Sequence, residues 1–482
     1  MKFTSLFKIG FIILMACQFS CRKDFNTIKS NGNLSFSKDT LFLDTVFNNL
    51  STTTKILKVY NNSKNDILIP KIQLEKSDSK YRINVDGISG TEFNDVLILQ
   101  KDSIYVFVEG TIAANETNAE MVYEDKILFD PNGTQQHVNL VTLVKEATFL
   151  YNSNNSDFEI SETNFTNTKP YVIYGNAIVP KNGSLTIDAG AIVHFSKNSS
   201  LTISQGATLN INGTQNDSIV FKSDNLNHEY DQVPGQWQGI NINNANTVNI
   251  NYLKVLNPTT GLNITNNNNL ITIKNTEIYN AAENGIYTKN TNIVGENMVI
   301  GQAGKAGLFL QGGDYTFKHC TFANYWSKGI KSESTVSLTN YYIDDIDSEI
   351  NTPLKSANFI NCIISGTRNS ELFLDKIDNE PIFNFNIKNC LLDLEKGDDL
   401  YNTDNNTYYT NVLLNKNLDF RNTTINDLRI GLNNEGINQA DITTATEVPL
   451  DIIGTNRTTT PDIGAYQHID FKTLETEDEE DK

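Results

Sequence analysis

The sequence is poor in the residues that most enzymes and metal sites use. Five histidines, five cysteines and two tryptophans occur among 482 residues, and no G-x-S-x-G, Walker, H-E-x-x-H or paired C-x-x-C motif is present. Cations are also scarce, because 38 Lys and Arg stand against 57 Asp and Glu and leave a net charge of -19. Nucleic acids and anionic surfaces bind clustered Lys and Arg, so this balance argues against nucleic acid or an anionic surface as a partner.

Long apolar runs are missing as well. The apolar run near the N-terminus, residues 9–16, follows Lys2 and Lys8 and is too short to span a bilayer. A basic start, a short apolar run and small residues are typical of an export signal, which we assign to residues 1–21. At the other end, the acidic run in residues 471–482 is typical of a disordered, solvated tail.

Two cysteines close this segment, which resembles bacterial lipoprotein signals, in which such a cysteine becomes the acylated N-terminus. Cys17 has the better preceding residues, "LMAC". Cys21 is followed by "RKDF", which resembles the surface-export signal of Bacteroidota lipoproteins. We expect lipid on Cys21, with Cys17 as the alternative, and several acyl chains suffice for stable membrane attachment. The resemblance implies a location in the outer membrane, facing the cell exterior.

Residues 22–147 contain short runs with a period of two, such as "SIYVFVEGTI" and "HVNLVTLVK". Each run is typical of a half-buried strand, and the Asn, Gly, Asp and Ser clusters between them are typical of turns. About seven such strands predict an antiparallel β-sandwich of immunoglobulin-like type. The segment "LKVYNNSKNDILIP" resembles N-terminal Ig-like modules of Bacteroidota surface lipoproteins. The polar stretch 148–169 is either a linker or the coil by which the chain enters the next domain.

The remaining residues, 170–470, repeat themselves. A glycine before an apolar residue recurs as Gly239, Gly261, Gly285, Gly307 and Gly329, at spacings of 22, 24, 22 and 22 residues. A second motif, apolar at its first and sixth positions, begins at Ile250, Ile273, Val294, Phe317, Leu338, Phe359 and Ile387. A period of about 22 residues made of strands and turns predicts a right-handed parallel β-helix, whose coils bury their apolar sides on one another. The phrases "LTIDAGA" and "LTISQGA", 16 residues apart, fit tighter first coils or an N-terminal cap.

Two further segments carry a resemblance to a known group. The stretch "GSLTIDAGAIVHFSKNSSLTISQGATLNINGTQNDSIVFKSD", followed by "QWQGINI", is similar to the opening coils of bacterial pectate-lyase-like β-helix proteins. The ending "NRTTTPDIGAYQ" resembles the "DIGAYE" ending of that group. We expect this ending to cover the last coil, because a stack of parallel strands has open ends. Many members of the group cleave acidic polysaccharides by β-elimination, so the resemblance implies an enzyme as one alternative.

The second motif assigns roles to two of its positions. Its third position holds Tyr252, Asn275, Glu296, His319, Asn340, Asn361 and Asn389. We expect the asparagines among them to form a ladder of amides at a bend. Its fourth position includes Cys320, Cys362 and Cys390, whose side chains point into the coil. Stacked thiols at the strand spacing of about 4.8 Å are too far apart for a disulfide, so these cysteines are predicted to be buried, reduced and inert.

Chemistry of the β-elimination type requires a base and a cation, either Ca²⁺ on carboxylates or Arg and Lys, to neutralise a uronate. The candidate groups are Asp344, Asp345, Asp347, Glu349, Lys305, Lys318, His319, Lys328 and Lys331. Acidic loops are usually solvated and His319 stands on the ladder, so no catalytic or metal-binding residue is assigned and no cofactor is expected, with Ca²⁺ kept as an open alternative. The fold itself serves enzymes and scaffolds alike.

The leading prediction is therefore a surface-anchored, non-catalytic β-helix lipoprotein that presents an elongated face to a glycan or a surface protein. Tyr325 and Trp326, on a predicted coil loop, are the candidates for stacking on sugar rings. Trp237 belongs to the opening phrase of the β-helix and is expected to be packed. The alternative function is a polysaccharide lyase or glycoside hydrolase that acts on an acidic polysaccharide at the cell surface.

Overall fold

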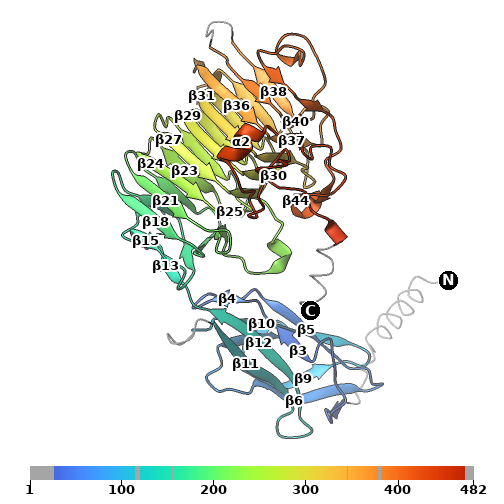
Figure 1. Ribbon diagram of the computed structural model, residues 1–482. Coiled ribbons are helices and arrows are strands. Elements are labelled where there is room, and N and C mark those ends of the chain that lie inside the picture. Colours follow the sequence, from blue (N-terminus) through green and yellow to red (C-terminus); the bar gives the residue numbers. More distant parts are fainter. Residues whose placement is uncertain (1–26, 114–119, 155, 345, 378–381, 473–482) are drawn as a thin grey trace, which may run out of the picture. The chain divides into compact units, whose positions relative to one another are not determined.

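In the computed structural model, the structure describes residues 27–113, 120–154, 156–344, 346–377 and 382–472. The chain divides into two compact units, Met1–Glu146 and Ala147–Lys482 (Figure 1). The helical elements that lie wholly within the described residues are α2 (Ile442–Glu447) and three short turns, η1 (His228–Tyr230), η2 (Asp399–Tyr401) and η3 (Thr423–Ile425). None of the helices in these ranges is long and apolar enough to cross a membrane. Cys21, the predicted lipidation site, lies outside the described residues.

The first unit is a β-sandwich, as predicted, but it is not wholly antiparallel, because Thr27–Lys29, Thr40–Phe42 and Val46–Phe47 each pair with their neighbour in parallel. One sheet runs in the order β1 (Thr27–Lys29), β6 (Asp66–Leu74), β11 (Glu120–Phe129), β12 (Gln136–Lys145) and β3 (Thr40–Phe42), with β9 (Glu92–Ile98) beside β6 and β4 (Val46–Phe47) beside β12. The other sheet runs in the order β2 (Ser35–Phe36), β5 (Lys55–Tyr60), β10 (Ser103–Gly110), β7 (Tyr81–Val85) and β8 (Ile88–Gly90).

Strict alternation along the strands divides this unit into a core and an outer surface. On β10, Ile104, Val106 and Val108 are buried, while Tyr105 is exposed and Phe107 is half-buried on the opposite side. Because successive side chains of a strand point to opposite faces, one face of the five-stranded sheet fills the core and the other faces outward.

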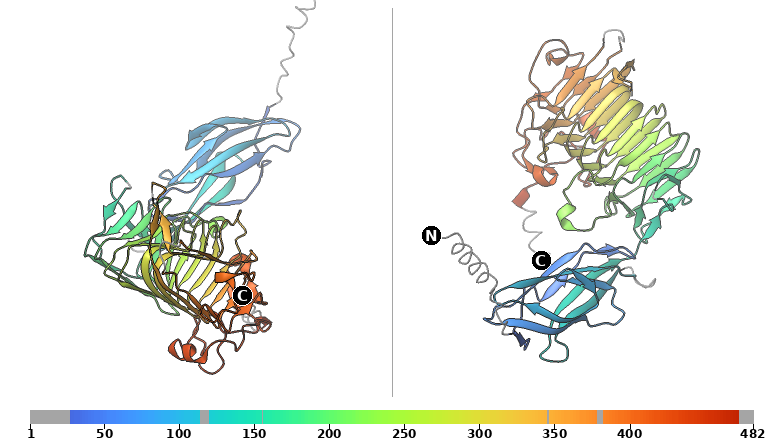
Figure 2. Two further views of the ribbon diagram at one scale, coloured as in Figure 1. Left: turned by 90° about the horizontal axis from the view of Figure 1, so that it is seen from above. Right: turned by 180° about the vertical axis from the view of Figure 1, so that it is seen from behind.

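The second unit is a right-handed parallel β-helix with three faces, also as predicted (Figures 1 and 2). The first face is formed by β14 (Phe158–Glu159), β17 (Asn176–Val179), β20 (Ser200–Ile203), β23 (Gly239–Asn243), β26 (Leu262–Thr265), β33 (Val336–Thr339) and β38 (Leu372–Asp375). The second face is formed by β15 (Asn164–Phe165), β18 (Ser184–Asp188), β21 (Thr208–Asn212), β24 (Thr247–Asn251), β27 (Leu270–Lys274), β36 (Leu354–Ile360), β39 (Asn386–Lys388) and β41 (Tyr409–Thr410). Two long strands, β29 (Ile286–Glu296) and β31 (Leu308–Lys318), run through both of these faces.

The third face is a continuous parallel sheet of its own. It runs in the order β13 (Thr148–Leu150), β16 (Tyr171–Ile173), β19 (Ile192–Phe195), β22 (Ile219–Ser223), β25 (Leu253–Leu256), β28 (Glu277–Ala281), β30 (Val299–Ala303), β32 (Thr321–Asn324), β37 (Ile363–Gly366), β40 (Leu391–Leu392) and β42 (Leu413–Leu414). Two hairpins stand outside the coils, β34 (Tyr341–Ile343) with β35 (Glu349–Asn351) and β43 (Phe420–Asn422) with β44 (Asp427–Ile430).

The register shows which of the predicted repeats are coils. Leu185 on β18 is paired with Leu209 on β21, whereas Leu201 on β20 is paired with Ile240 on β23. The two similar phrases therefore occupy different faces, and the prediction that 16 residues form a tight coil or cap is wrong. Both phrases look alike because each face needs the same alternation of apolar and polar side chains.

The predicted asparagine stack at the bend between the second and third faces is present, but its amides form a ladder only in part, since Asn389 donates to Gln439 O instead of to a neighbouring amide. This asparagine corner consists of Tyr252, Asn275, Asn297, His319, Asn361 and Asn389, whose φ angles lie between 47° and 56°. Asparagine tolerates this left-handed conformation better than most residues do. Asn275 accepts a hydrogen bond from Asn297 Nδ2 at 2.9 Å. Glu296 and Asn340 were assigned to the third position wrongly, because the stack of the motif runs through Gly295 rather than Val294 and passes from Phe317 directly to Phe359.

The three cysteines of the β-helix lie just beyond the asparagine corner. Cys320, Cys362 and Cys390 are buried and free of disulfides, as predicted. The sulfur of Cys390 accepts a hydrogen bond from the Cys362 amide at 3.2 Å, and Cys320 accepts one from the Met298 amide at 3.4 Å. The thiols therefore act as small side chains that also accept amide hydrogen bonds inside the coil.

The C-terminal segment does not cover the last coil, contrary to the prediction. Its residues Leu428, Ile463 and Tyr466 pack on the outer side of the third face, where Val299 and Ile363 are buried. Arg457, Ala465 and Gly464 are hydrogen bonded to Asn297, Thr321 and Asn361, which belong to three successive coils. In its later coils the third face is apolar on its outer side as well, so these coils require a cover, and the C-terminal segment packs there rather than over the last coil.

Candidate functional site

The bend between the third and first faces is lined by glycines in its early coils. This glycine corner contains Gly239, Gly261, Gly285 and Gly307, whose following residues are paired in register. A methyl group at Gly261 would lie 2.4 Å from Gly285 O, and one at Gly285 would lie 2.6 Å from Gly307 O. The coils approach one another too closely here for a side chain, which explains the repeated glycine.

The glycine stack ends after Gly307. The next two positions of the corner are Thr335 and Glu371, because the amide of Leu308 donates to Thr335 O and the amide of Val336 donates to Glu371 O, both at 2.9 Å. Gly329, which the sequence places in the series, lies instead in an exposed part of the loop 325–335. Its spacing of 22 residues is therefore a coincidence, and the true corner residue lies six positions further along the chain.

A buried ion pair fills the space that opens at this end of the corner. Lys331 Nζ lies 2.6 Å from Glu371 Oε2, and their side chains are 4% and 0% exposed. Glu371 also accepts hydrogen bonds from the amide and the hydroxyl of Thr335, at 2.9 and 2.8 Å, and from the Arg368 amide at 2.6 Å. Lys331 donates further to Asn324 O at 3.1 Å. Burial lowers the pKa of Lys331, while Glu371 opposes this shift.

The polar network continues into the next coil. Ser365 Oγ donates to Asp393 Oδ2 and lies 2.8 Å from Tyr325 Oη. Burial raises the pKa of Asp393, and the hydrogen bonds from Ser365 and Gly366 only partly offset this effect. A buried ion pair whose hydrogen bonds are all made holds the loops that carry it in one arrangement. Separating the partners would leave an unpaired charge in the interior, which is costly.

An open groove lies beside this network, at the surface of the last coils. This corner groove has a volume of 590 Å³ and is lined by Ser334, Arg368, Asn369, Ser370, Leu372, Phe373, Glu395, Lys396, Gly397 and Tyr401. Its walls come from the loops that leave the third face in three successive coils, residues 325–335, 367–371 and 393–408. Tyr401 Oη accepts a hydrogen bond from the Leu374 amide at 2.9 Å, which fixes η2 against β38.

The charged groups of the corner groove are unevenly partnered. Arg368 Nη1 donates to Ser332 O at 3.1 Å, and no ion pair to Arg368 is found within the described part of the chain. Glu395 accepts a hydrogen bond from Asn369 at 2.8 Å. Lys396 lies 3.4 Å from Asp404, but this pair is 59% and 84% exposed and therefore weak. The groove thus presents an available guanidinium beside polar side chains.

The corner groove also continues a row of outward-facing side chains on the first face. In successive coils this row consists of Asn241, Asn263, Tyr287, Phe309, Ser337 and Phe373. The amide of Asn263 donates to Asn241 at 3.1 Å, and the rings of Tyr287 and Phe309 meet edge to face with centroids 5.6 Å apart. Phe373 is the most open of these aromatic rings, at 45% exposure. Rings and amides spaced by one strand form a track along the coils.

The two predicted sugar-stacking residues lie at the start of the loop 325–335. Tyr325 is half-buried, because its hydroxyl bonds Ser365 and its ring meets Phe420 edge to face at 5.9 Å. Trp326 is half-buried beside Gly304, where a methyl group would lie 3.2 Å from its ring. Neither residue lines the corner groove, although both belong to one of the loops that form it. Trp237 is fully buried and stacks on Phe195 at 4.1 Å, as predicted.

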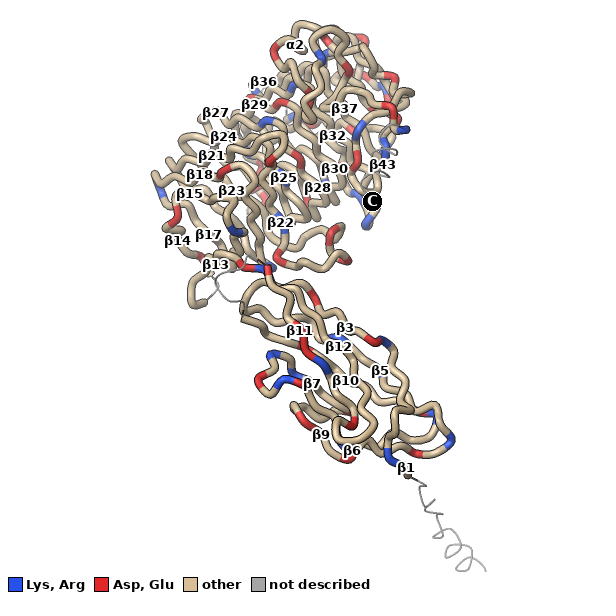
Figure 3. The backbone as a smooth tube through the Cα atoms, turned by 60° about the horizontal axis from the view of Figure 1, so that its bottom comes forward, with Lys and Arg blue, Asp and Glu red and all other residues tan. Residues whose placement is uncertain are grey.

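The candidate groups for β-elimination are dispersed, as are the acidic and basic positions along the backbone in general (Figure 3). Asp344 accepts hydrogen bonds from the amides of Ile346 and Ser348 in its own hairpin, and Asp345 lies outside the described residues. Lys305 is paired with Glu283, Lys318 with Glu447 and Lys331 with Glu371, while Lys328 donates to Gln232 O. No group of three or more His, Cys, Asp or Glu side chains in the described ranges could hold a metal ion.

His319 has a structural environment. It is fully buried on the asparagine corner, with Nε2 2.8 Å from Asn361 Nδ2. The orientation of Asn361 is set by the Asp441 amide, which donates to Asn361 Oδ1 at 2.7 Å. Burial lowers the pKa of His319 well below its usual range, and Arg457 adds to the shift. A neutral imidazole in this position accepts a hydrogen bond and has no route to a substrate.

No sequence motif marks Arg368, Phe373 or Lys396. Arg368 and Lys396 lie in loops whose lengths differ from coil to coil, and Phe373 lies on β38 directly after one of these loops. The one available signal is the end of the glycine series, where "GTRNSELFLDK" replaces the glycine with Glu371. The other coils require glycine at this position, because there is no room for a side chain. A charged residue there marks the coil at which the close approach of the corner ends.

Comparison with known proteins supports the β-helix and leaves the corner groove unassigned. Residues 158–255 match the family "Pectate-lyase like beta helix domain", which indicates a carbohydrate-related role. This match ends within β25 and does not reach the groove. Among solved structures, the "ASH / PapD-like domain of human CEP192 (PapD-like domain 7)" is similar at 10% identity and a TM-score of 0.17, covering 24% of this chain and 86% of that chain. No curated protein matches this chain.

Proposed function

We propose that this chain is a non-catalytic, glycan-binding β-helix protein of Bacteroidota type, which a lipid on Cys21 anchors in the outer membrane with its binding face toward the cell exterior. We further propose that the corner groove binds an acidic polysaccharide. One observation carries this assignment: Arg368, which has no ion pair among the described residues, stands beside the exposed ring of Phe373 in an open groove.

The chemistry of the groove suits a uronate-containing chain. A guanidinium pairs with a carboxylate through two parallel hydrogen bonds, which gives both strength and orientation. The Phe373 ring offers an apolar surface for the CH face of a sugar, and Asn369 and Ser370 offer hydrogen bonds to hydroxyl groups. The row of side chains on the first face extends this surface along the coils, so that several consecutive sugars of a polymer could contact it.

Binding is tested with the mature chain and a panel of polygalacturonate, alginate and neutral galactan, measured by isothermal titration calorimetry. Arg368→Ala should weaken binding of the acidic polymers at least about tenfold and leave the neutral one unchanged, since it removes a bidentate contact. Arg368→Lys should restore only part of the affinity, because an ammonium lacks the fork geometry. Phe42→Ala, which truncates a 69% exposed ring on β3 of the sandwich, is the matched control. Acidic polymers that bind all variants equally would disprove the assignment.

The same mixtures test the alternative of a lyase or hydrolase. Ultraviolet absorbance from an unsaturated uronate, with or without added Ca²⁺, would establish β-elimination, and new reducing ends without that absorbance would establish hydrolysis. Either result would replace the binding function. Asp393, whose pKa burial raises, would then be the first residue to substitute, because it lies beside the groove and near both Lys331 and Glu371.

The lipid anchor is tested separately. Cys21→Ser should abolish labelling by a palmitate analogue and release the protein from the membrane fraction, since acyl chains supply the attachment. Cys17→Ser serves as the control and should leave both properties unchanged. The reverse pattern would assign the lipid to Cys17, and labelling of neither cysteine in the native chain would remove the anchor from the proposal. Digestion of intact cells by an added protease reports whether the protein faces outward.

A further inference from the structure

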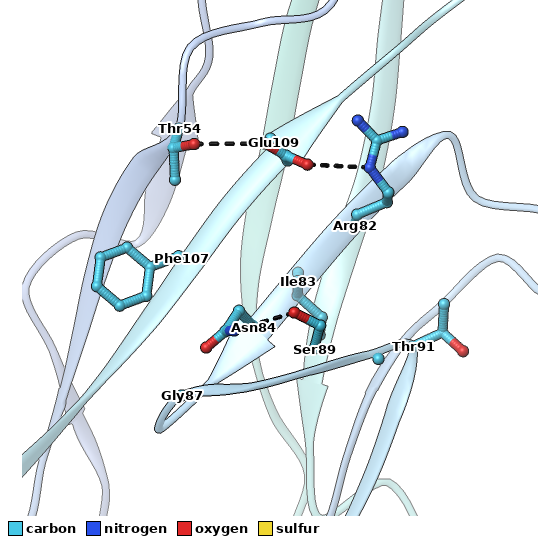
Figure 4. Close-up of a pocket in the computed structure, with 10 residues that line it drawn as sticks. Thr54, Arg82, Ile83, Asn84, Gly87, Ser89, Thr91, Phe107 and Glu109 are labelled. Atoms are coloured by element: carbon cyan, nitrogen blue, oxygen red, sulfur yellow. Dashed lines mark hydrogen bonds and ion pairs between the residues drawn. The ribbon is translucent and has the colours of Figure 1, made fainter.

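The outer side of the five-stranded sheet contains a second hollow, which belongs to the sandwich unit and has no role in the function proposed above. This sandwich pocket has a volume of 680 Å³ and is lined by Thr54, Arg82, Ile83, Asn84, Gly87, Ser89, Gly90, Thr91, Phe107 and Glu109 (Figure 4). Three neighbouring strands, β10, β7 and β8, supply most of this lining.

The register of these strands places the lining residues side by side. Phe107 on β10 stands opposite Asn84 on β7, and Glu109 stands opposite Arg82. The chain then turns at Asp86 and Gly87, whose φ angles are 49° and 86°, and returns along β8. Asn84 Nδ2 donates to Ser89 Oγ across this hairpin at 3.0 Å, which holds the wall formed by β8 against the floor.

The polar groups at the rim are already oriented. Arg82 Nε lies 3.0 Å from Glu109 Oε1, and Thr54 Oγ1 donates to Glu109 Oε2 at 3.4 Å, as the dashed lines in Figure 4 show. The Arg82 and Glu109 side chains remain 55% and 42% exposed. These two residues are the charged members of the lining and they neutralise each other, so the pocket offers paired donors and acceptors without net charge.

Phe107 is the aromatic residue of the pocket lining. Tyr105, which lies on the same face of β10 but does not line the pocket, stacks with Phe107, with the ring planes inclined by 23° and the centroids 6.3 Å apart. Tyr105 is 42% exposed even though the Lys58 ammonium lies 4.8 Å from its ring centroid. The Phe107 ring beside a neutral polar rim matches a ligand with an apolar flat face and a hydroxylated edge.

We propose that the sandwich pocket binds a neutral glycan segment. A pyranose ring presents axial CH groups on one face, which pack on an aromatic ring, and hydroxyl groups at its edge, which accept from a guanidinium and donate to a carboxylate. An acidic glycan fits this site poorly, because Arg82, the group that the carboxylate of such a glycan would bind, is already paired with Glu109. The site therefore differs from the corner groove both in its unit and in its ligand class.

Calorimetry or saturation-transfer NMR on the mature chain tests the proposal with cellohexaose, xylohexaose and mannohexaose as probes. At least one of these probes should bind the native chain. Phe107→Ala should weaken that binding at least about tenfold, since a central aromatic contact is lost. Arg82→Ala, at an exposed position, should also weaken it and secures the test if Phe107→Ala fails to fold. Tyr105→Phe keeps the ring and should bind normally.

Two controls keep this proposal separate from the corner groove. Phe42→Ala on the other sheet and Arg368→Ala in the groove should leave binding of the neutral probes unchanged. The proposal is overturned if no neutral probe binds, if Phe107→Ala and Arg82→Ala bind normally, or if Arg368→Ala abolishes neutral binding. Failure of the acidic panel with success of the neutral one would refute the groove assignment alone, and the converse would refute the sandwich pocket alone.

Discussion

The two units hide apolar strand faces in different ways. In the sandwich, each residue faces an unrelated residue from a distant strand, so that Tyr105 is opposite Lys58 and Phe107 is opposite Ile56. In the β-helix, equivalent residues of successive coils stack, as in the run of Ile211, Ile250 and Ile273. Stacking places similar residues at the same position of successive coils. A position whose residue type changes from one coil to the next is therefore easy to recognise. Thr335 and Glu371 at the glycine corner are such positions.

The largest expected effect concerns how far damage spreads in each unit. Phe317 is buried between the rings of Phe322 and Phe359, with centroids 5.5 and 5.3 Å away, and Phe129 is buried beside Phe36 at 4.8 Å. Replacement of either phenylalanine by Ala should cost about 3–5 kcal/mol of unfolding free energy.

Hydrogen exchange distinguishes the two outcomes. Phe317→Ala should remove amide protection mainly from the adjacent coils on β29, β31 and β36, because a coil contacts only its neighbours. Phe129→Ala should lower protection throughout the sandwich, since a small two-sheet domain unfolds cooperatively. Loss of protection along every coil in Phe317→Ala would show that the β-helix behaves as one cooperative block and would remove this contrast.

The pH dependence of stability should have opposite signs at two aspartates. Burial raises the pKa of Asp224, which follows β22, from 3.8 to about 6. Asp224 therefore contributes stability below pH 3.8, and this contribution is lost as the pH rises through about 6. Asp224→Asn should stabilise the β-helix by up to about 3 kcal/mol at neutral pH and by little at low pH.

Asp44 in the sandwich is the counterpart. Burial raises its pKa, but hydrogen bonds from Lys55 and Thr53 outweigh burial and leave the pKa lowered. Its contribution is present above pH 3.8 and is lost as the pH falls through the folded-state pKa. Asp44→Asn should thus destabilise the sandwich at neutral pH and lose this effect in acid. Urea unfolding over a pH series, with a probe in each unit, would contradict the assignment if both variants shifted in the same direction.

These contrasts also explain what the sequence could reveal. The β-helix was predictable because stacking imposes a period, and the positions of Asn275, Cys362 and Gly261 follow from it. The sandwich was predictable only from the alternation along its strands, which fixes the faces of β10 but not its neighbours. Strand partners such as β1 and β6 depend on long-range packing that leaves no local mark.

The functional site was less accessible from sequence, for a related reason. Arg368 and Phe373 belong to one coil, but they line a groove only because loops of unequal length leave the same corner in the coils on either side. A period describes what is the same in each coil, and a groove arises where the coils differ. The false match at Gly329 shows the risk, because a spacing of 22 residues continued through a loop that had already left the corner.

A smaller effect separates two kinds of essential glycine. Gly261→Ala should destabilise the β-helix by about 1–3 kcal/mol through crowding, since the new methyl would also lie 2.6 Å from Ile278 Cγ2. Gly87 in the sandwich has open space around it and a φ of +86°, so Gly87→Ala should cost about 1 kcal/mol through backbone strain alone.

Asparagine substitutions provide the control for this pair. Gly87→Asn should recover much of the loss because asparagine tolerates a left-handed backbone, whereas Gly261→Asn should be at least as unstable as the alanine variant. The midpoint of thermal unfolding of each unit measures the difference. Recovery at Gly261 as well would mean that conformation rather than the close approach of coils selects glycine at the corner.

The smallest effect concerns Tyr252, the one aromatic residue on the asparagine corner. Its φ is 48° and its side chain has no amide group, so the side chain of Asn275 donates to the neighbouring Asn251 instead, at 2.8 Å. The free energy of unfolding of Tyr252→Asn should exceed that of Tyr252→Ala by about 1 kcal/mol, because asparagine tolerates the left-handed backbone. A new hydrogen bond in the amide ladder should add about 0.5 kcal/mol. Lys101 in the sandwich, with a φ of 59°, supplies the reference without a ladder. If Lys101→Asn and Tyr252→Asn gain equally over their alanine variants in urea unfolding, the amide ladder adds nothing and the corner selects asparagine only for its backbone.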